Sequence, residues 1–328
     1  MDEKNIKEST NQETIKQENQ EPQQTFNPVI DIKALQYDKP YYEVVEDERN
    51  NLLSQAKKSG TISRILLFLV LALGTGGIIT YMNAIYIAAG ICAGLAVALL
   101  ITHLILSKRI ARPDEKGYIN NASAAIDSFV FSDTRFSDVL FDTTAKLELG
   151  DVYSDGVYAG LIKMISRNLV TGKFNDASFK ICECALHQPG EKNRPEAAFI
   201  GKYMVFPNSL HFEGRILLIS KGKEDVDLPT DLDGLVQVEG EDKFFAYALS
   251  EKSYKELSKK FISAIKKIDI SNHLLNLNIA VWSGKTIVYA SYDDATISLS
   301  PAEPFKREAQ ESFRKDLIQI LEALDLIK

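Results

Sequence analysis

The organisation of the chain is decided by the apolar stretch "ISRILLFLVLALGTGGIITYMNAIYIAAGICAGLAVALLITHLIL" (residues 62–106). Its only charged side chain is Arg64, close to its start. As a single helix it would be about 68 Å long, more than twice the hydrocarbon core of a bilayer, which is about 30 Å thick. We therefore predict a transmembrane hairpin over residues 62–107, with spans at about 62–81 and 84–106. A buried helix pair in a soluble protein is the disfavoured alternative, given the length and the near absence of charge.

Basic side chains flank the two predicted spans and are missing from the connector between them. Lys57, Lys58 and Arg64 lie at the start of the first span, and Lys108, Arg109 and Arg112 follow the second. Because cytoplasmic loops retain Lys and Arg, both ends of the hairpin are expected on the cytoplasmic side. Tyr81 and Tyr86 flank the connector, where aromatic rings are typical of the membrane interface.

Small residues recur at a spacing of four in both spans. When the chain is folded about residues 82–83, Gly76 falls near Gly90, and Gly94 near Ala72. Small side chains let helices approach closely in lipid, so Gly76, Gly90 and Gly94 are predicted to pack the hairpin on itself. The alternative is that Gly90 and Gly94 form the contact of a homo-oligomer.

The spans lack the ionisable groups on which transporters and proton channels depend. Apart from Arg64 at the edge, His103 is the one candidate, and it lies near the cytoplasmic end. We interpret the hairpin as an anchor rather than a conduction pathway.

The segment before the hairpin is polar. Residues 1–28 are rich in Glu, Gln, Asn and Lys and nearly free of large apolar groups, so they cannot bury enough surface to offset the entropy of ordering. We predict a disordered leader over residues 1–40, with a partner-binding tail as the alternative, and a short juxtamembrane helix over residues 41–61.

The region 113–328 reads as an α+β domain with a mainly antiparallel sheet. A helix is predicted over residues 114–131, and residues 131–165 show no clear period. Strands are predicted at 178–187, 197–207, 213–220 and 243–250. One amphipathic helix with a stripe from Tyr254 to Ile268 follows, with Ser250 as its N-cap. A hairpin of strands 274–282 and 285–292 turns at Ser283 and Gly284, and a last helix covers about 304–326.

Composition excludes some classes of function. The formal net charge of −7 disfavours a general nucleic-acid binder, which carries a basic face. Three cysteines do not make a disulfide framework and are typical of a reducing compartment. Phosphate-loop, zinc-protease and nucleophile-elbow motifs are all absent, so the sequence offers no catalytic residues and no cofactor.

The sharpest cluster of metal-ligand types is Cys182-Glu-Cys184 with His187. Thiolate and imidazole suit zinc, but a structural zinc site normally has four ligands. On a strand the two cysteines share one face and His187 falls on the other. Two buried thiols that act as small apolar side chains are therefore the favoured interpretation.

A second, weaker candidate for a cation site is the acidic region 224–242. It includes Asp231 and Asp233, but Pro229 stands where a calcium loop needs a ligand. A solvated loop between strands is the favoured interpretation.

Three segments of this domain resemble a known family. They are "NLVTGKFNDASFKICECALH" (168–187), "FIGKYMVFPNSLHFEGRILLI" (199–219) and "VQVEGEDKFFAYALS" (236–250). Their order and spacing are similar to those of the bacterial membrane-anchored Domain of Unknown Function family thirty-one thirty-seven, over about residues 50–328. The resemblance implies a two-span hairpin, a strand pair that contains Gly and a location in the bacterial inner membrane. The family has no assigned activity, so the resemblance brings no site residues.

These observations favour a non-enzymatic module that binds a protein partner at the cytoplasmic face of the membrane. One alternative is a membrane-tethered enzyme with an unrecognised site, for which Asp231 and Asp233 are a carboxylate pair. The other is a sensor of anionic lipid that uses the basic residues around the hairpin.

Overall fold

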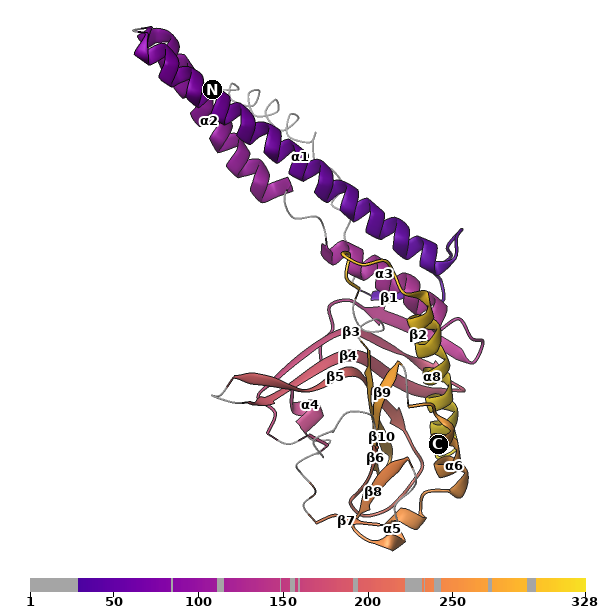
Figure 1. Ribbon diagram of the computed structural model, residues 1–328. Coiled ribbons are helices and arrows are strands. Elements are labelled where there is room, and N and C mark those ends of the chain that lie inside the picture. The colour runs from indigo at the N-terminus through magenta and orange to yellow at the C-terminus, as the bar shows by residue number, and fades with distance from the viewer. Residues whose placement is uncertain are drawn as a thin grey trace, which may run out of the picture.

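A computed structural model of the chain describes residues 29–83, 85–110, 115–147, 149–153, 157–158, 160–190, 194–221, 232, 234–238, 243–270, 273–293 and 299–328. It is a mixed helix and sheet structure in which two long apolar helices project from a domain built on one large antiparallel sheet (Figure 1). Residues 1–28 lie outside the described residues, so the disorder predicted for them stays a prediction. Residues 29–40, predicted as part of the leader, are ordered and include a strand.

The described strands form one ten-stranded sheet in the order β1-β2-β3-β4-β5-β10-β9-β6-β8-β7, and all neighbours are antiparallel. The strands are β1 (Val29–Asp31), β2 (Phe136–Asp142), β3 (Lys163–Phe174), β4 (Ala177–Pro189), β5 (Pro195–Pro207), β6 (Arg215–Ser220), β7 (Val236–Gln237), β8 (Phe244–Ala248), β9 (Leu274–Trp282) and β10 (Lys285–Tyr292). The predicted antiparallel α+β class is confirmed, and β9 and β10 have the predicted bounds.

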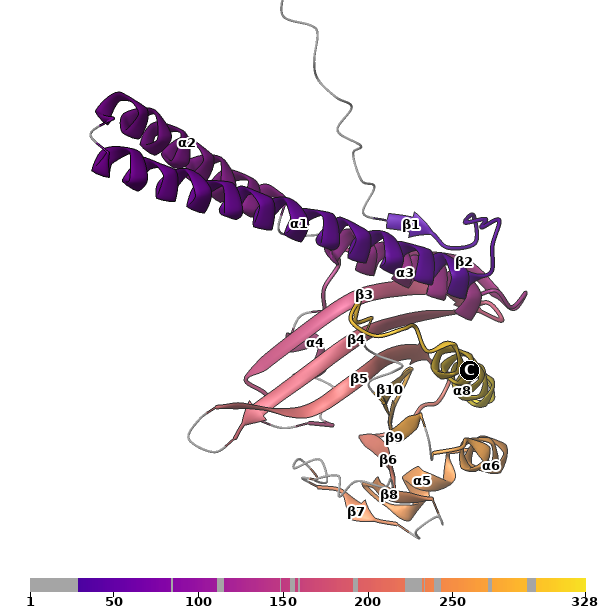
Figure 2. The ribbon, with the colours of Figure 1, turned by 45° about the horizontal axis from the view of Figure 1, so that its top comes forward.

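The helices are α1 (Tyr41–Met82), α2 (Tyr86–Ile110), α3 (Glu115–Val130), α4 (Leu149–Tyr153), α5 (Glu251–Lys255), α6 (Lys259–Lys267) and α8 (Arg307–Asp325). Of these, α3, α6 and α8 contribute apolar side chains to a core on one face of the sheet. A second, smaller core covers the opposite face and includes Val152 of α4. Both faces of the sheet are therefore covered over part of their area (Figure 2).

Strand β4 shows how alternation fills both cores. Phe179 and Ile181 are buried with the α3 and α8 side chains, whereas Cys182 and Cys184 are buried in the second core. Because successive side chains point to opposite faces of a sheet, a strand covered on both faces loses the simple apolar-polar pattern.

The long β3–β4 hairpin turns on two residues with left-handed backbone, Asn175 (φ 45°) and Asp176 (φ 66°). Two consecutive residues with positive φ are the signature of the type I′ turn, whose twist matches that of the flanking strands. Asn and Asp tolerate this conformation better than other residues that carry a Cβ. The sequence Asn-Asp therefore fixes the register of these two long strands.

Glycine at 201 is required by the close approach of β5 to β10. A Cβ at Gly201 would lie 2.2 Å from the carbonyl oxygen of Ala290 and 2.8 Å from the ring of Phe199. Since the Ala290 atom belongs to the backbone of the neighbouring strand, the sheet would have to shift to accept a side chain. The close approach of β5 to β10 therefore requires a residue without a Cβ at position 201.

We predict that Gly201→Ala destabilises the domain by about 1–3 kcal/mol, the usual range for overpacking. Gly150→Ala is the matched control, because a Cβ there meets no described atom within 4 Å. Thermal unfolding of the detergent-solubilised chain measures both variants. Equal midpoints for the two variants would contradict the close approach of β5 to β10.

The predicted juxtamembrane helix (41–61) and first span (62–81) are one continuous element, α1, with 42 residues. The expectation of two separate helices was wrong, because no proline interrupts residues 41–82 and Gly60 alone does not break the helix. At about 1.5 Å per residue α1 is about 63 Å long. Its first turns lie along α3, and the remainder pairs with α2 beyond the domain (Figures 1 and 2).

The first turns of α1 are held to the domain by apolar and polar contacts. Val45 is completely buried and Leu52 is 6% exposed. The ring of Tyr41 stacks on Phe129 of α3, with ring centroids 4.2 Å apart. Glu46 accepts a hydrogen bond of 2.6 Å from the backbone N–H of Phe305, in the segment before α8. The contacts come from two separate parts of the domain, so α1 is fixed in direction.

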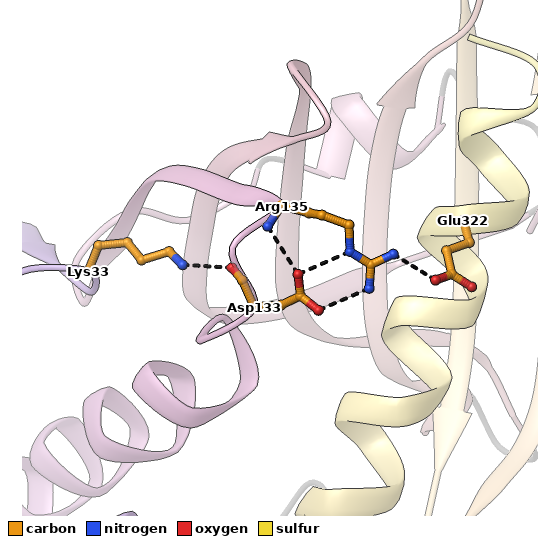
Figure 3. Close-up of polar contacts among 4 residues, drawn as sticks. All are labelled: Lys33, Asp133, Arg135 and Glu322. Atoms are coloured by element: carbon orange, nitrogen blue, oxygen red, sulfur yellow. Dashed lines mark hydrogen bonds and ion pairs between the residues drawn. The ribbon is translucent and has the colours of Figure 1, made fainter.

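Figure 3 shows a polar clamp that joins β1, the α3–β2 turn and α8. The Lys33 ammonium donates to the carbonyl oxygen of Asp133 at 2.8 Å. Arg135 forms two hydrogen bonds with the Asp133 carboxylate, at 3.0 and 2.9 Å, and its third nitrogen contacts Glu322 of α8 at 2.6 Å. The hydrogen bonds from Arg135 lower the pKa of Asp133 to about 2. The clamp fixes α8 relative to the strand edge on which β1 lies.

The helix pair α1–α2 uses a glycine other than those predicted. A Cβ at Gly77 would lie 3.4 Å from the Cβ of Cys92, so the helices touch there. A Cβ at Gly76, Gly90 or Gly94 meets nothing within 4 Å among the described residues. The predicted self-packing through these three glycines is therefore corrected. Each residue turns an α-helix by about 100°, so a shift of one position, from 76 to 77, moves the contact to another face.

The contact between Gly77 and Cys92 makes a sharp test of the hairpin. Disulfides need Cβ atoms about 3.5–4.5 Å apart, and Cys92 is a free thiol. We predict that Gly77→Cys forms a disulfide with Cys92 under mild oxidation of membranes, detected as a linked peptide by mass spectrometry. Gly76→Cys is the control and should stay reduced. Cross-linking of Gly76→Cys in place of Gly77→Cys would contradict this register of the hairpin.

The predicted helix with a stripe from Tyr254 to Ile268 is two short helices. Ser250 caps α5, as predicted, by accepting a hydrogen bond from the backbone N–H of Ser253. A second cap, Ser258, accepts from the N–H of Phe261 and starts α6. Because a cap residue has non-helical backbone, Ser258 divides the apolar stripe without changing which residues are buried. Strands β1, β2, β3 and β7 and helix α4 were not predicted from the residue pattern.

Candidate functional site

The thiol cluster does not assemble a metal site among the described residues. Cys182 and Cys184 share one face of β4, as predicted, and are 2% and 4% exposed. Burial raises the pKa of Cys184 to about 12, and the pKa of Cys182 also rises. His187 follows Leu186 on the strand and faces the opposite side. In the parts of the chain that the structure describes, no three His, Cys, Asp or Glu side chains lie close enough to share a metal ion.

The other predicted site residues are only partly described. Lys57, Lys58 and Arg64 are exposed on α1. The side chains of Lys108 and Arg109, and all of Arg112, lie outside the described residues. Most of the acidic region 224–242 also lies outside them, including Asp231 and Asp233, so its cation binding stays untested.

A buried ion pair lies on the helix-covered face of the sheet. Glu183 of β4 accepts a hydrogen bond from the Lys202 ammonium at 2.9 Å, and both side chains are nearly buried, with 12% and 13% exposed. Arg167 of β3 contacts the other Glu183 oxygen at 2.5 Å from a more exposed position. The two cations lower the pKa of Glu183 despite its burial, so this carboxylate is ionised at neutral pH.

A small cavity of about 30 Å³ adjoins this pair beneath α3 and α8. Its polar lining consists of Ser123, Asp127, Asn168, Glu183, Lys202 and Gln310. The volume suffices for a water molecule but is far below the several hundred Å³ of an organic ligand site. The cavity can hold a titrating group and solvent, and it is too small to be a substrate pocket.

Asp127 of α3 is the titrating group at this cavity. Burial raises its pKa to about 7; the positive charge of Lys202 opposes the shift and the negative charge of Glu183 adds to it. In the unfolded chain an aspartate has a pKa near 4. The folded state therefore binds this proton more tightly than the unfolded state, and the free energy of unfolding falls as pH rises from about 4 to 7.

We predict that Asp127→Asn stabilises the domain at pH 8 by about 2–4 kcal/mol relative to the native chain. The difference should nearly vanish near pH 4, where Asp127 is protonated in the folded state and about half protonated in the unfolded chain. Unfolding midpoints of the two chains at pH 4, 6 and 8 provide the measurement. A difference that is independent of pH would show that Asp127 does not titrate in this range.

An open groove of about 750 Å³ lies on the opposite face of the sheet. It crosses the ends of β2, β3, β4, β5 and β10, and its lining includes Leu147, Thr171, Lys173, Lys180, Tyr203, Val205 and Lys285. Tyr203 and Val205 belong to the second core, which places the groove away from α3 and α8. Its size is within the range of sites that take a ligand or an extended peptide.

The groove is locally positive although the whole chain has a net charge of −7. Its charged lining is Lys173, Lys180, Lys285 and Asp138. Asp138 forms an exposed ion pair of 2.7 Å with Lys173. Lys180 is exposed and makes no ion pair or hydrogen bond with the described residues. The groove thus combines an apolar floor with cations that an anionic ligand can approach.

No protein-family model, curated protein or solved structure matches the chain, so these comparisons assign it to no family. The resemblance to the Domain of Unknown Function family therefore stays a prediction.

Neither the groove nor the Asp127 cavity was found from the residue pattern. Asp127 had a local signal, since it follows Ala124, Ala125 and Ile126, all buried. The groove had none, because Lys173 and Lys180 become neighbours only through the β3–β4 pairing.

Proposed function

We propose that the protein is an anchored module of the bacterial inner membrane that binds a protein partner with its C-terminal domain. In this proposal α1 and α2 cross the membrane as a hairpin, both termini are cytoplasmic, and the domain stands at the cytoplasmic face. The observation that carries the proposal is the continuity of α1, which packs on the domain at one end and exposes an apolar surface at the other.

The exposure of the two apolar helices supports a lipid environment. The most apolar 18-residue window of α1 has 0% of its residues buried, and that of α2 has 6%. Exposed side chains along it include Phe68 (71%), Leu71 (63%) and Ile78 (63%). The core helix of a soluble protein would be mostly buried, and a surface of this size in water drives association. A bilayer is the solvent in which this exposure carries no penalty.

The two sites of the domain favour binding over catalysis. The cavity at Asp127 is too small for a substrate, and the larger groove has a floor of sheet residues with lysines above it. A shallow positive groove on a rigid sheet can hold a partner by contact alone. The leader and the groove lie on one tethered chain, which suits a scaffold that gathers partners at the membrane.

We predict that Leu71→Arg combined with Leu95→Arg releases the chain from carbonate-washed membranes. Each arginine would sit near the middle of a span, at a cost of about 2.5–3.5 kcal/mol. Leu53→Arg is the matched control, because Leu53 is an exposed leucine of α1 outside the predicted span, and it should leave the chain in the membrane pellet.

Retention of the double variant in the pellet would contradict the hairpin. A reporter inserted after Asn83 separates topology from anchoring, because it should report the non-cytoplasmic side. Crosslinking in intact membranes then tests the binding role: one partner should be recovered repeatedly, whereas random recovery would contradict a specific interaction.

A further inference from the structure

We propose that the groove binds an extended, acidic segment of a protein partner, with carboxylates on Lys173, Lys180 and Lys285. The inference rests on the proposed binding function and names the chemistry that the partner presents. Its basis is the spacing of the three lysines, the apolar groups between them and the position of the groove on the domain.

Strand register fixes the spacing of the lysines. Lys180 lies opposite Thr171, so Lys173 is its diagonal neighbour, at about 7–8 Å between Cα atoms. On the other side Lys180 lies opposite Val205, and Lys285 lies opposite Pro207. Two strand spacings, and an offset of two residues along the strands from Val205 to Pro207, therefore separate Lys180 from Lys285, which is about 12 Å.

An extended chain matches this spacing. Alternate side chains of an extended segment lie on one side, about 6.6–6.8 Å apart. Two acidic residues separated by one residue thus reach Lys173 and Lys180 together. A third acidic residue four positions further along, about 13 Å away, lies on the same side and is within reach of the long Lys285 side chain. The ligand is in this way a short peptide with several carboxylates on one face.

The apolar side chains in and beside the groove indicate which residues of the partner segment lie between the acidic ones. Val205 lies beside Lys180 in the register, and Tyr203 and Leu147 line the same groove. Leu140, opposite Thr171 on β2, is 40% exposed. A partner segment that alternates acidic and apolar residues places charge on the lysines and covers these side chains.

The groove lies on the face of the sheet opposite α1 and α3. The sheet therefore stands between the groove residues and the first turns of α1. In the proposed topology this favours a protein segment over the bilayer as the ligand. Nucleic acid is disfavoured as well, because three lysines on a chain of net charge −7 are a small basic surface.

Fluorescence anisotropy on the full chain tests this proposal. The chain is held in nanodiscs of neutral lipid, and the probe is a fluorescein-labelled peptide of alternating Glu and Val. We expect saturable binding that weakens with salt. Lys180→Glu should weaken it about fivefold to tenfold, because a contact of opposite charge becomes one of like charge.

Two controls isolate the groove. Lys260→Glu changes an exposed lysine of α6 outside the groove and should leave the affinity unchanged. A peptide of alternating Gln and Val should bind at least tenfold more weakly than the Glu peptide. Lys180 is exposed, so the fold should survive its substitution, and Lys180→Gln provides a milder variant with an intermediate loss.

Three outcomes would overturn the proposal. The first is equal affinity of Lys180→Glu and Lys260→Glu for the peptide. The second is displacement of the peptide by RNA or by phosphatidylglycerol vesicles at lower concentration than by unlabelled peptide. The third is a large gain in affinity on removal of residues 1–28, which carry six acidic side chains and would then be the occupant themselves.

The peptide-binding experiment can be interpreted independently of the proposed function. Peptide binding is measured on purified chain, so it neither requires the topology of the hairpin nor depends on recovery of a cellular partner. If the peptide does not bind but a crosslinked partner is still recovered, the proposed binding function stands. The proposal that the groove holds an acidic segment would then be contradicted.

Discussion

The packing of the first turns of α1 on α3 is the contact on which the rest of the arrangement depends. Val45 and Leu52 are buried there, and Tyr41 stacks on Phe129. A short helix joined to the span by a loop would leave the domain free to rotate. Here the first turns of α1 pack on the domain and the rest of the same helix pairs with α2. Side chains in the domain core therefore set the direction of the hairpin.

The sheet separates two chemical environments. On the helix-covered face, charges are removed from water and paired, as Glu183 is with Lys202, and Asp127 holds its proton to an unusually high pH. On the other face, Lys180 is exposed beside a partly apolar floor, and Lys173 and Lys285 line the same groove. The first environment is enclosed by the fold, and the second is the one that a partner can reach. The proposed function uses this difference.

Sequence patterns predicted α3 and α8 nearly at their bounds, because their apolar side chains recur at helical spacing. The β9–β10 hairpin was found from its Ser283-Gly284 turn, although both strands are buried on both faces. Strands β2 and β3 were missed because their alternation is interrupted: β2 carries left-handed Asp138, β3 carries left-handed Asn168, and the register shifts beside each. The candidate sites were beyond prediction for a related reason: Lys173 and Lys180 meet through pairing, and Asp127 meets Glu183 through packing.

Because α1 is continuous, the rotation of the domain about the helix axis is fixed relative to the hairpin. Each residue added between Leu53 and Ile62 would turn the domain by about 100° around the helix axis and lift it by about 1.5 Å. An insertion of seven residues, close to two full turns, would lift the domain by about 10 Å and nearly restore its facing. In the proposed membrane arrangement, the length of this segment thus sets both the direction in which the groove faces and its height above the bilayer.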